Sequence, residues 1–441
     1  MNKKLKYVDV MGLVVGSIIG WGSFTLPGTK FLKESGLINT FIGLFLGGIL
    51  VMTIQYAYHI MMKNHSQEGG EYTYTLENLG DGHGFLVAWS LVLCYLSMIP
   101  LNASAFVLLL RAFLKESLNV GYLYHIVGYP IYITDIVIMI VVIGIFAMIN
   151  IKGLFLSSRI QNIMSLLLVI IVLGLLFAVI KRSDIEIFYN HYIRQDGVKF
   201  GEISKVLAIV PFLFVGFDVV PQVAKDLGFK PSKSTLLVVL SVFIGIVIYA
   251  SLNLIAAMSF SRDEVLKTSW AVADSIILKA GKPGFYLMLF ALGAAVIGGI
   301  NGFMIASSKL IASLSLQGHL PKVFSYYSKR RVYPYAIWLV SAIGAVTSFW
   351  GRQVILYIVD MSSLLAAIAY AYVSFIGIKR SKKKISKFLS LLGMMVSIGF
   401  ILLLLLPVSP AHLKKEALIF LLLWMLAGIF VYIRYRKRQI V

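Results

Sequence analysis

The sequence predicts an all-α polytopic membrane protein that folds as a single transmembrane domain over residues 1–441. Hydrophobic residues make up 59% of the chain and charged residues 13%, and the mean hydropathy is +0.89. A soluble globular domain carries about 25% charged residues, so the composition excludes that class. Long apolar runs recur along the chain, and a helix of about 20 such residues crosses a bilayer. Together these observations predict a bundle of membrane-spanning helices.

The apolar runs predict twelve transmembrane helices, with both ends of the chain on the cytoplasmic side. We place them near residues 8–31, 38–61, 85–111, 130–149, 157–180, 204–224, 234–260, 284–313, 335–350, 354–378, 388–407 and 417–433.

Basic residues support this topology. In a soluble protein the formal net charge of +21 would suggest a nucleic-acid partner. Here the densest basic patches fall on the cytoplasmic side, at residues 3–6, 329–331, 379–387 and 434–438. That distribution follows the positive-inside rule, which places lysine and arginine near anionic headgroups. We therefore expect a protein of the cytoplasmic membrane, surrounded by the lipid bilayer, with no nucleic-acid partner.

The first apolar run is interrupted as a helix. Residues 16–28 read GSIIGWGSFTLPG, so Gly20, Gly22, Pro27 and Gly28 break the pattern. Glycines at these positions are consistent with close helix packing or a kink. The interpretation that we favour is a discontinuous helix, because irregular backbone at membrane depth is tolerated where it lines a polar cavity.

The sixth apolar run repeats the interruption. Residues 211–221 read PFLFVGFDVVP and place Gly216 and Asp218 near the middle of the membrane. An ionisable residue there indicates function, although an aspartate bonded to nearby backbone is the structural alternative. Each interrupted helix begins a group of five, which predicts an inverted repeat of residues 8–181 and 204–378 with peripheral helices at 388–433. Such paired interruptions point to a binding site at the membrane midplane.

A helix break offers free N–H groups on one side and free carbonyls on the other. A solute with a carboxylate and an ammonium group matches that pair, and a neutral polar solute fits less well. We expect the carboxylate at Gly22 and Ser23, with help from the Ser23 hydroxyl. Trp21 either fills the pocket or points away from it. We expect the ammonium group at the carbonyls of Ile18, Ile19, Phe214 and Val215. Gly20 and Gly216 belong to the breaks themselves, and Phe212 and Phe217 are expected as pocket wall or lid.

Other polar features carry alternative interpretations. Ser307 and Ser308 in the eighth helix either bond to their own helix carbonyls or form a sodium site with the first helix. Asp360 either lines a vestibule or caps a helix end. The segment SQEGGEYTY within residues 63–84 is either a turn followed by a short helix or an ordinary turn, and TSWAVADSIILKA within residues 261–283 is either a short helix above a vestibule or a solvated connection.

No sequence pattern indicates an enzyme. HExxH, GxSxG and P-loop motifs are absent, and Cys94 is the only cysteine. We therefore expect no catalytic residues, no metal site and no cofactor.

Four motifs resemble those of the amino acid, polyamine and organocation transporters. Residues 16–28 are similar to the family pattern G-x-I-I-G-x-G-x-F-x-x-P-G, and EGGEYTY at residues 68–74 is similar to its G-G-x-Y-x-Y. Phe214, Gly216, Phe217 and Asp218 resemble its F-x-G-F-D. The inner-loop pattern is matched by Ser308, Ala312, Gly318, Leu320, Pro321 and Lys322.

The resemblance implies a LeuT-like fold, in which two five-helix repeats are inverted, and a permease that moves an amino acid by alternating access. It also implies that Phe212 is a gating aromatic and that Asp218 occupies a proton-sensing position. A proton or sodium ion would drive a symporter or antiporter. The alternatives are a transporter of an organic amine or polyamine, or a sensor that binds solute without moving it.

Three residues depart from the family pattern. Lys309 replaces an arginine, Leu168 replaces a lysine found in many proton-coupled members, and Trp21 replaces a small residue. These departures affect the cytoplasmic gate, the coupling and the substrate size, respectively.

Overall fold

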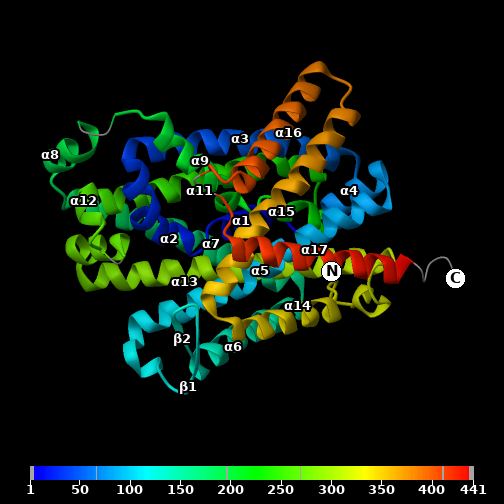
Figure 1. Ribbon diagram of the computed structural model, residues 1–441, viewed down its shortest axis with the longest axis horizontal. Helices are drawn as coiled ribbons and strands as arrows, with labels where there is room; N and C mark the ends of the chain where they lie inside the picture. Colours follow the sequence, from blue (N-terminus) through cyan, green and yellow to red (C-terminus); the bar gives the residue numbers. More distant parts are fainter. Residues whose placement is uncertain (1–3, 66, 195–196, 269, 410–411, 437–441) are drawn as a thin grey trace.

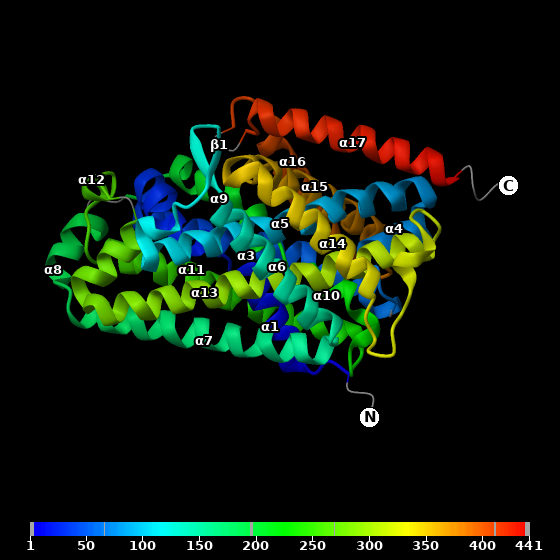
Figure 2. The same cartoon turned by 90° about the horizontal axis from the view of Figure 1, so that it is seen from below.

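The computed structural model describes residues 4–65, 67–194, 197–268, 270–409 and 412–436, and these residues are mostly helical. Figures 1 and 2 show long helices running side by side between two ends of a bundle. One end carries α4 and the start of α1, and we call it the N-terminal face. The other end carries α8 and α12, and we call it the opposite face.

The first half of the chain forms seven α-helices and a hairpin. Its elements are α1 (Tyr7–Ile18), α2 (Gly22–Leu26), the π-helix η1 (Pro27–Ser35), α3 (Gly36–Asn64), α4 (Gly70–Leu79), α5 (Asp81–Leu114), η2 (Lys115–Leu118), β1 (Tyr122–Ile126), β2 (Tyr129–Tyr132), α6 (Ile133–Ile151) and α7 (Leu154–Lys181).

The second half adds ten α-helices. Its elements are α8 (Ile185–Phe188), η3 (Tyr189–Ile193), α9 (Phe200–Phe214), α10 (Val219–Gln222), η4 (Ala224–Asp226), η5 (Pro231–Lys233), α11 (Ser234–Ala257), α12 (Arg262–Val265), α13 (Ala271–Leu316), η6 (Lys322–Ser325), α14 (Pro334–Thr347), η7 (Ser348–Trp350), α15 (Gly351–Arg380), α16 (Lys384–Leu405) and α17 (Lys415–Arg436).

Ten helical stretches of the described chain are long and apolar enough to cross a membrane. Five of them run over two or more neighbouring helical elements; in one of these α3 follows η1 directly, and in another α15 follows η7 at Gly351, where φ is 70°. The shorter apolar helix α1 is counted separately from the ten. The chain is therefore a multi-pass membrane protein, whereas the twelve crossings and their inverted repeat stay predictions.

Glycines bring the central helices close together. α1 packs against α7, α11 and α13. A Cβ atom on Gly298 of α13 would lie 3.0 Å from the Gly16 carbonyl oxygen. A Cβ atom on Gly302 would lie 2.2 Å from the Ser17 hydroxyl oxygen. Because Gly298 and Gly302 have no side chain, α13 can approach α1 closely, as glycines allow in a membrane bundle.

The structure contains both short helices that the sequence suggested, and it adds a hairpin. The short helix expected after Gly69 is α4. The one expected near residue 270 is the start of α13, which bends at Gly281, where φ is 69°. The hairpin of β1 and β2 was not expected. Val127 and Gly128 form its two-residue turn, with φ values of 49° and 78°. Turns with both φ values positive match the twist of paired strands.

The last two helices lie at the outside of the bundle (Figure 2). α16 packs against α3 and α15, and α17 packs mainly against α15. Only 11% of the apolar window of α17 is buried, the lowest share among the ten stretches. Their role as a peripheral pair outside an inverted repeat stays a prediction.

Candidate substrate site

The first interruption is a true break in the backbone. α1 ends at Ile18, Ile19 is extended, and α2 begins at Gly22. The amides of Ser23 and Phe24 donate to the Gly20 and Trp21 carbonyls at 3.2 and 3.1 Å. Among the described residues, no partner is found for the amides of Gly20, Trp21 and Gly22. The break therefore presents three free N–H groups at the start of α2.

The second break lies between α9 and α10, and the Asp218 side chain bonds to its backbone. Gly216 has a φ of 117°, and a Cβ atom on it would lie 2.6 Å from the Ser17 Cβ. Only glycine satisfies both the backbone conformation and this close contact. The Gly216 amide donates to Asp218 Oδ1 at 2.9 Å, and the Tyr95 hydroxyl donates to Oδ2 at 2.9 Å. The two breaks are thus packed against each other.

A cavity of about 410 Å³ lies beside the two breaks. It reaches from the breaks to Lys30 of η1 and to His412 and Lys414 of the segment between α16 and α17. One wall is a stripe along α15 formed by Arg352, Leu356, Val359, Asp360 and Ser363. The other walls come from α1, α2, α5, α9, α11 and α13, by way of Ser17, Thr25, Leu26, Met98, Leu101, Asn102, Pro211, Tyr249 and Phe303.

Six of the predicted binding residues line this cavity: Ile18, Gly20, Trp21, Gly22, Phe212 and Val215. The carbonyls of Ile18, Ile19 and Val215 have no hydrogen-bond partner within the described chain, whereas that of Phe214 accepts from the Phe217 amide. Asp360 also lines the cavity, which agrees with the vestibule interpretation.

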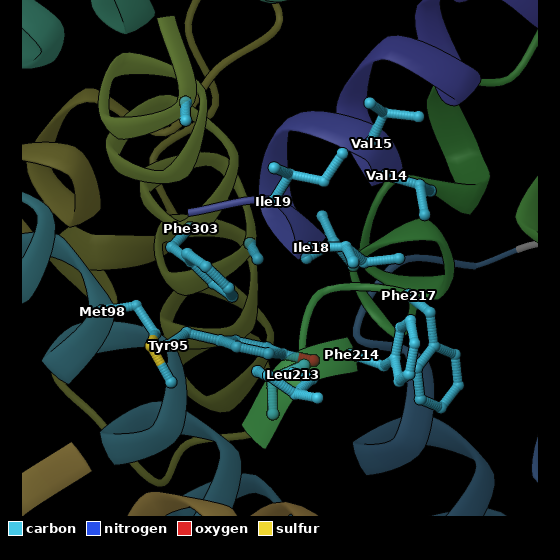
Figure 3. Close-up of a cluster of buried hydrophobic side chains, with 14 of the residues drawn as sticks. Val14, Val15, Ile18, Ile19, Tyr95, Met98, Leu213, Phe214, Phe217 and Phe303 are labelled. Atoms are coloured by element: carbon cyan, nitrogen blue, oxygen red, sulfur yellow. The ribbon is translucent and has the colours of Figure 1, made fainter. Parts of the chain in front are cut away.

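Five of the predicted residues do not line the cavity: Ile19, Ser23, Phe214, Gly216 and Phe217. The Ser23 hydroxyl is buried and donates to the Gly20 carbonyl at 2.8 Å, so its proton is already used within the break. Phe217 packs against Tyr58 and Tyr370, with ring centroids 5.6 and 5.0 Å apart. Figure 3 shows Phe214 and Phe217 within the apolar cluster around Ile18 and Tyr95. These residues are buried around the breaks, outside the cavity lining, and stabilise the backbone there.

Ser307 and Ser308 are buried and lie away from the cavity. Their hydroxyls donate to the carbonyls of Phe303 at 2.6 Å and Ile305 at 3.0 Å, one turn back in α13. This is the ordinary bonding of serine inside a helix. The sodium site stays a prediction without support from this geometry.

A buried ionic cluster lies at the N-terminal face, and we call it the Lys309 cluster. Lys309 Nζ lies 2.5 Å from Asp226 Oδ2 and 3.2 Å from Glu68 Oε2. Lys225 Nζ lies 3.4 Å from Glu68 Oε1, and the Tyr333 hydroxyl donates to the same oxygen. The cluster ties α13 to the segments before α4, after α10 and before α14. It therefore joins four parts of the chain across one end of the bundle.

Electrostatics keep Glu68 ionised in this cluster. Burial alone would raise the pKa of its carboxyl group, but Lys309, the Tyr333 hydroxyl and Lys225 together lower the pKa below its ordinary value. Beside the cluster, the Leu5 amide donates to the Asp226 carbonyl at 2.9 Å, and the Gly228 amide donates to the Leu5 carbonyl at 2.8 Å. The segment at Leu5 therefore packs beside the Lys309 cluster.

Glu71 is an acid that the sequence reasoning missed. It is fully buried in α4, and one carboxylate oxygen accepts from the Gln222 side chain at 2.7 Å. Its other oxygen, Oε1, has no partner in the described part of the chain. Burial, followed by the charge of Asp218, raises the pKa of Glu71 well above its ordinary value. The motif EGGEYTY contains this residue, yet only the fold brings it toward Asp218.

Comparisons with known proteins indicate the family of the chain. A family model described as amino acid permease matches residues 5–433. The chain is 22% identical over 384 residues to the b(0,+)-type amino acid transporter 1 of Mus musculus, covering 86% of this chain and 74% of that protein. It is 23% identical over 353 residues to the Asc-type amino acid transporter 1 of Mus musculus, covering 77% and 63%.

A third relative is the large neutral amino acids transporter small subunit 2 of Mus musculus, 22% identical over 384 residues, covering 86% of this chain and 69% of that protein. All three relatives are transporters by name, which confirms the expectation that the chain is not an enzyme. Because the family model spans nearly the whole chain, the protein belongs to the amino acid permease family.

Proposed function

We propose that this protein is a secondary active transporter that moves an amino acid across the cytoplasmic membrane by alternating access. The observation that carries the proposal is the position of the cavity. It adjoins both helix breaks and reaches Lys30 and Lys414, while the Lys309 cluster lies outside its lining, across the N-terminal face. A site that is reached from one side and closed on the other is what alternating access requires.

The free backbone groups of the breaks supply the binding chemistry. The substrate carboxylate binds the amides of Gly20, Trp21 and Gly22, where the start of a helix favours negative charge. The ammonium group meets the carbonyls of Ile18 and Val215, which line the same cavity. This assignment differs from the sequence expectation in one respect, because the Ser23 hydroxyl is used within the break. Phe212 lines the cavity and stays the candidate gating aromatic.

The Lys309 cluster is the gate at the N-terminal face in this proposal. The distribution of basic residues favours a cytoplasmic location for that face and for both ends of the chain. The conformation described is then open toward the outside. For substrate to leave on the cytoplasmic side, the contacts of Lys309 with Glu68 and Asp226 must separate.

Proton coupling is assigned to Asp218 together with Glu71. Both carboxyl groups are fully buried, and Asp218 bonds directly to Gly216 at the second break. Two buried carboxylates without an adjacent cation are costly, so protonation of one of them favours the packed state. Leu168 stands where many proton-coupled members of the resembling family have a lysine. The pair of Asp218 and Glu71 offers a separate route for proton coupling.

The proposal is tested with purified protein in liposomes. Uptake of labelled amino acids and counterflow against trapped unlabelled amino acid are measured for the wild type. Gly216→Ala should abolish both activities, because its Cβ would meet Ser17 at 2.6 Å and its backbone has φ 117°. Gly399→Ala is the matched control, since a Cβ there meets nothing within 4 Å. Binding without accumulation or counterflow would identify a sensor and reject the transporter.

A further inference from the structure

The cavity contains an arginine that the binding chemistry above does not use. Arg352 lies in the first turn of α15, and its guanidinium carbon is 4.1 Å from the ring centroid of Trp21. One terminal nitrogen, Nη1, donates to the Ser104 hydroxyl at 2.6 Å and to the Leu101 carbonyl at 3.4 Å. The other, Nη2, is buried and has no partner in the described part of the chain. The guanidinium is therefore fixed on one edge and free on the other.

A fixed guanidinium with a free edge is suited to a carboxylate. Arginine presents its donors in a planar fork that matches a carboxylate, and an aromatic face below the fork limits its motion. A buried charge without a partner is unfavourable, so a ligand that pairs with it gains binding free energy. Arg352 lines the same cavity as Gly20, Trp21 and Gly22, so a ligand bound at the breaks lies beside its side chain.

The acidic side chain that lines the cavity does not pair with Arg352. Asp360 is the acidic side chain of the lining, eight residues further along α15. Eight residues of helix advance about 12 Å, and no ion pair joins Asp360 to Arg352 in the described structure. Asp360 also faces Lys30 and Lys414, which line the same cavity and oppose its charge. Cationic side chains therefore outnumber acidic ones around the cavity.

We propose that Arg352 binds a carboxylate on the substrate side chain, so that the transported amino acid is an acidic one. This inference rests on the proposed transport function. Trp21 links the two halves of the site, because its amide faces the α-carboxylate and its indole supports the guanidinium that receives the second carboxylate. The bulky residue in place of a small one is then part of the recognition of the side chain.

The test compares glutamate with glutamine, which has nearly the same shape and lacks the negative charge. In liposomes the wild type should take up glutamate with a kcat/KM at least about tenfold above that for glutamine, since a site built for a charged partner rejects an isostere that lacks the charge. Arg352→Gln should lose at least about tenfold in kcat/KM for glutamate and retain uptake of glutamine. Arg159→Gln, an exposed arginine on α7, is the control for general loss of a positive charge and should leave both values unchanged.

The outcomes separate this inference from the transport function. Uptake of leucine or alanine with no preference for glutamate over glutamine would overturn the role of Arg352 and leave transport intact. An equal loss of kcat/KM for glutamate and glutamine in Arg352→Gln would indicate that Arg352 acts on a gate at Trp21 and not on the side-chain carboxylate. That result would also overturn the proposed role of Arg352. Accumulation of no amino acid at all would reject the transport function itself. If the variant did not fold, the ratio of glutamate to glutamine uptake in the wild type would decide alone.

Discussion

Replacing Lys309 by methionine should open the N-terminal face. The ammonium group lies 2.5 Å from Asp226 and 3.2 Å from Glu68, and the three side chains are 4%, 7% and 6% exposed. Removing one partner from a buried ion pair costs about 3 to 5 kcal/mol, because the remaining charge is left uncompensated. The whole penalty falls on the state in which this face is closed. Since 1.4 kcal/mol corresponds to a factor of ten, the population of that state should fall more than about a hundredfold relative to the open state.

Accessibility of the cavity measures this shift. Cys94 is the only cysteine and is buried, so Cys94→Ser provides a background without thiols. Leu356→Cys then places a reporter on the cavity wall, and a maleimide that does not cross the membrane is added at the opposite face. In this background Lys309→Met should slow the labelling of the reporter by at least about tenfold, because opening of the N-terminal face closes the other side.

Lys225→Met is the matched control within the same cluster. Its side chain is 53% exposed and its ammonium lies 3.4 Å from Glu68, so the pair contributes at most about 1 kcal/mol. Labelling should change less than about fivefold in this variant. Equal effects of the two substitutions, or unchanged labelling in a folded Lys309→Met protein, would refute the assignment of Lys309 as the central contact of a gate.

Three further predictions concern the acids. The pKa of Glu68 is lowered, so its stabilisation is present above the ordinary carboxyl pKa of about 4.3 and is lost as pH falls through the lower folded value; reporter labelling governed by this cluster, expressed relative to the labelling of an exposed cysteine at the same pH, should stay constant between pH 5 and 8. The pKa of Glu71 is raised, so the folded state keeps a proton that the unfolded chain loses and stability falls as pH rises above about 4.3; thermal unfolding should show this slope in the wild type and lose it in Glu71→Gln. Asp218→Asn should alter the transport rate and flatten its pH dependence in liposomes, and an unchanged profile would remove Asp218 from coupling.

Local sequence signals predicted the backbone of the site well. Gly20, Gly22 and Gly216 act through their own conformations and their small size, so their effect is visible without the rest of the fold. The apolar runs likewise located the long helices to within a few residues, although α13 begins earlier and bends at Gly281. The hairpin escaped because its short strands, rich in aromatic residues, lie between two apolar runs and resemble a loop.

The side-chain pairings could not be predicted, because they join distant parts of the chain. Lys309 and Glu68 are 241 residues apart, and Asp218 and Tyr95 are 123 apart. A sequence shows that such residues are unusual in a membrane protein but does not show which partner the fold supplies. Ser23 shows that a local contact can also escape prediction. Its hydroxyl was assigned to the substrate, and the tight turn of the break uses it locally instead.

Trp21 shows how a departure from a family pattern acquires a physical meaning. A small residue at this position would leave the Arg352 guanidinium with its contacts to Ser104 and Leu101 alone. The indole face adds a platform at 4.1 Å that restricts the guanidinium to one orientation toward the cavity. The break itself is unaffected, because the Trp21 amide remains free beside those of Gly20 and Gly22. In the proposed transporter the backbone site can therefore still recognise the groups common to all amino acids, and Trp21 and Arg352 together are the residues that we propose to select the side chain.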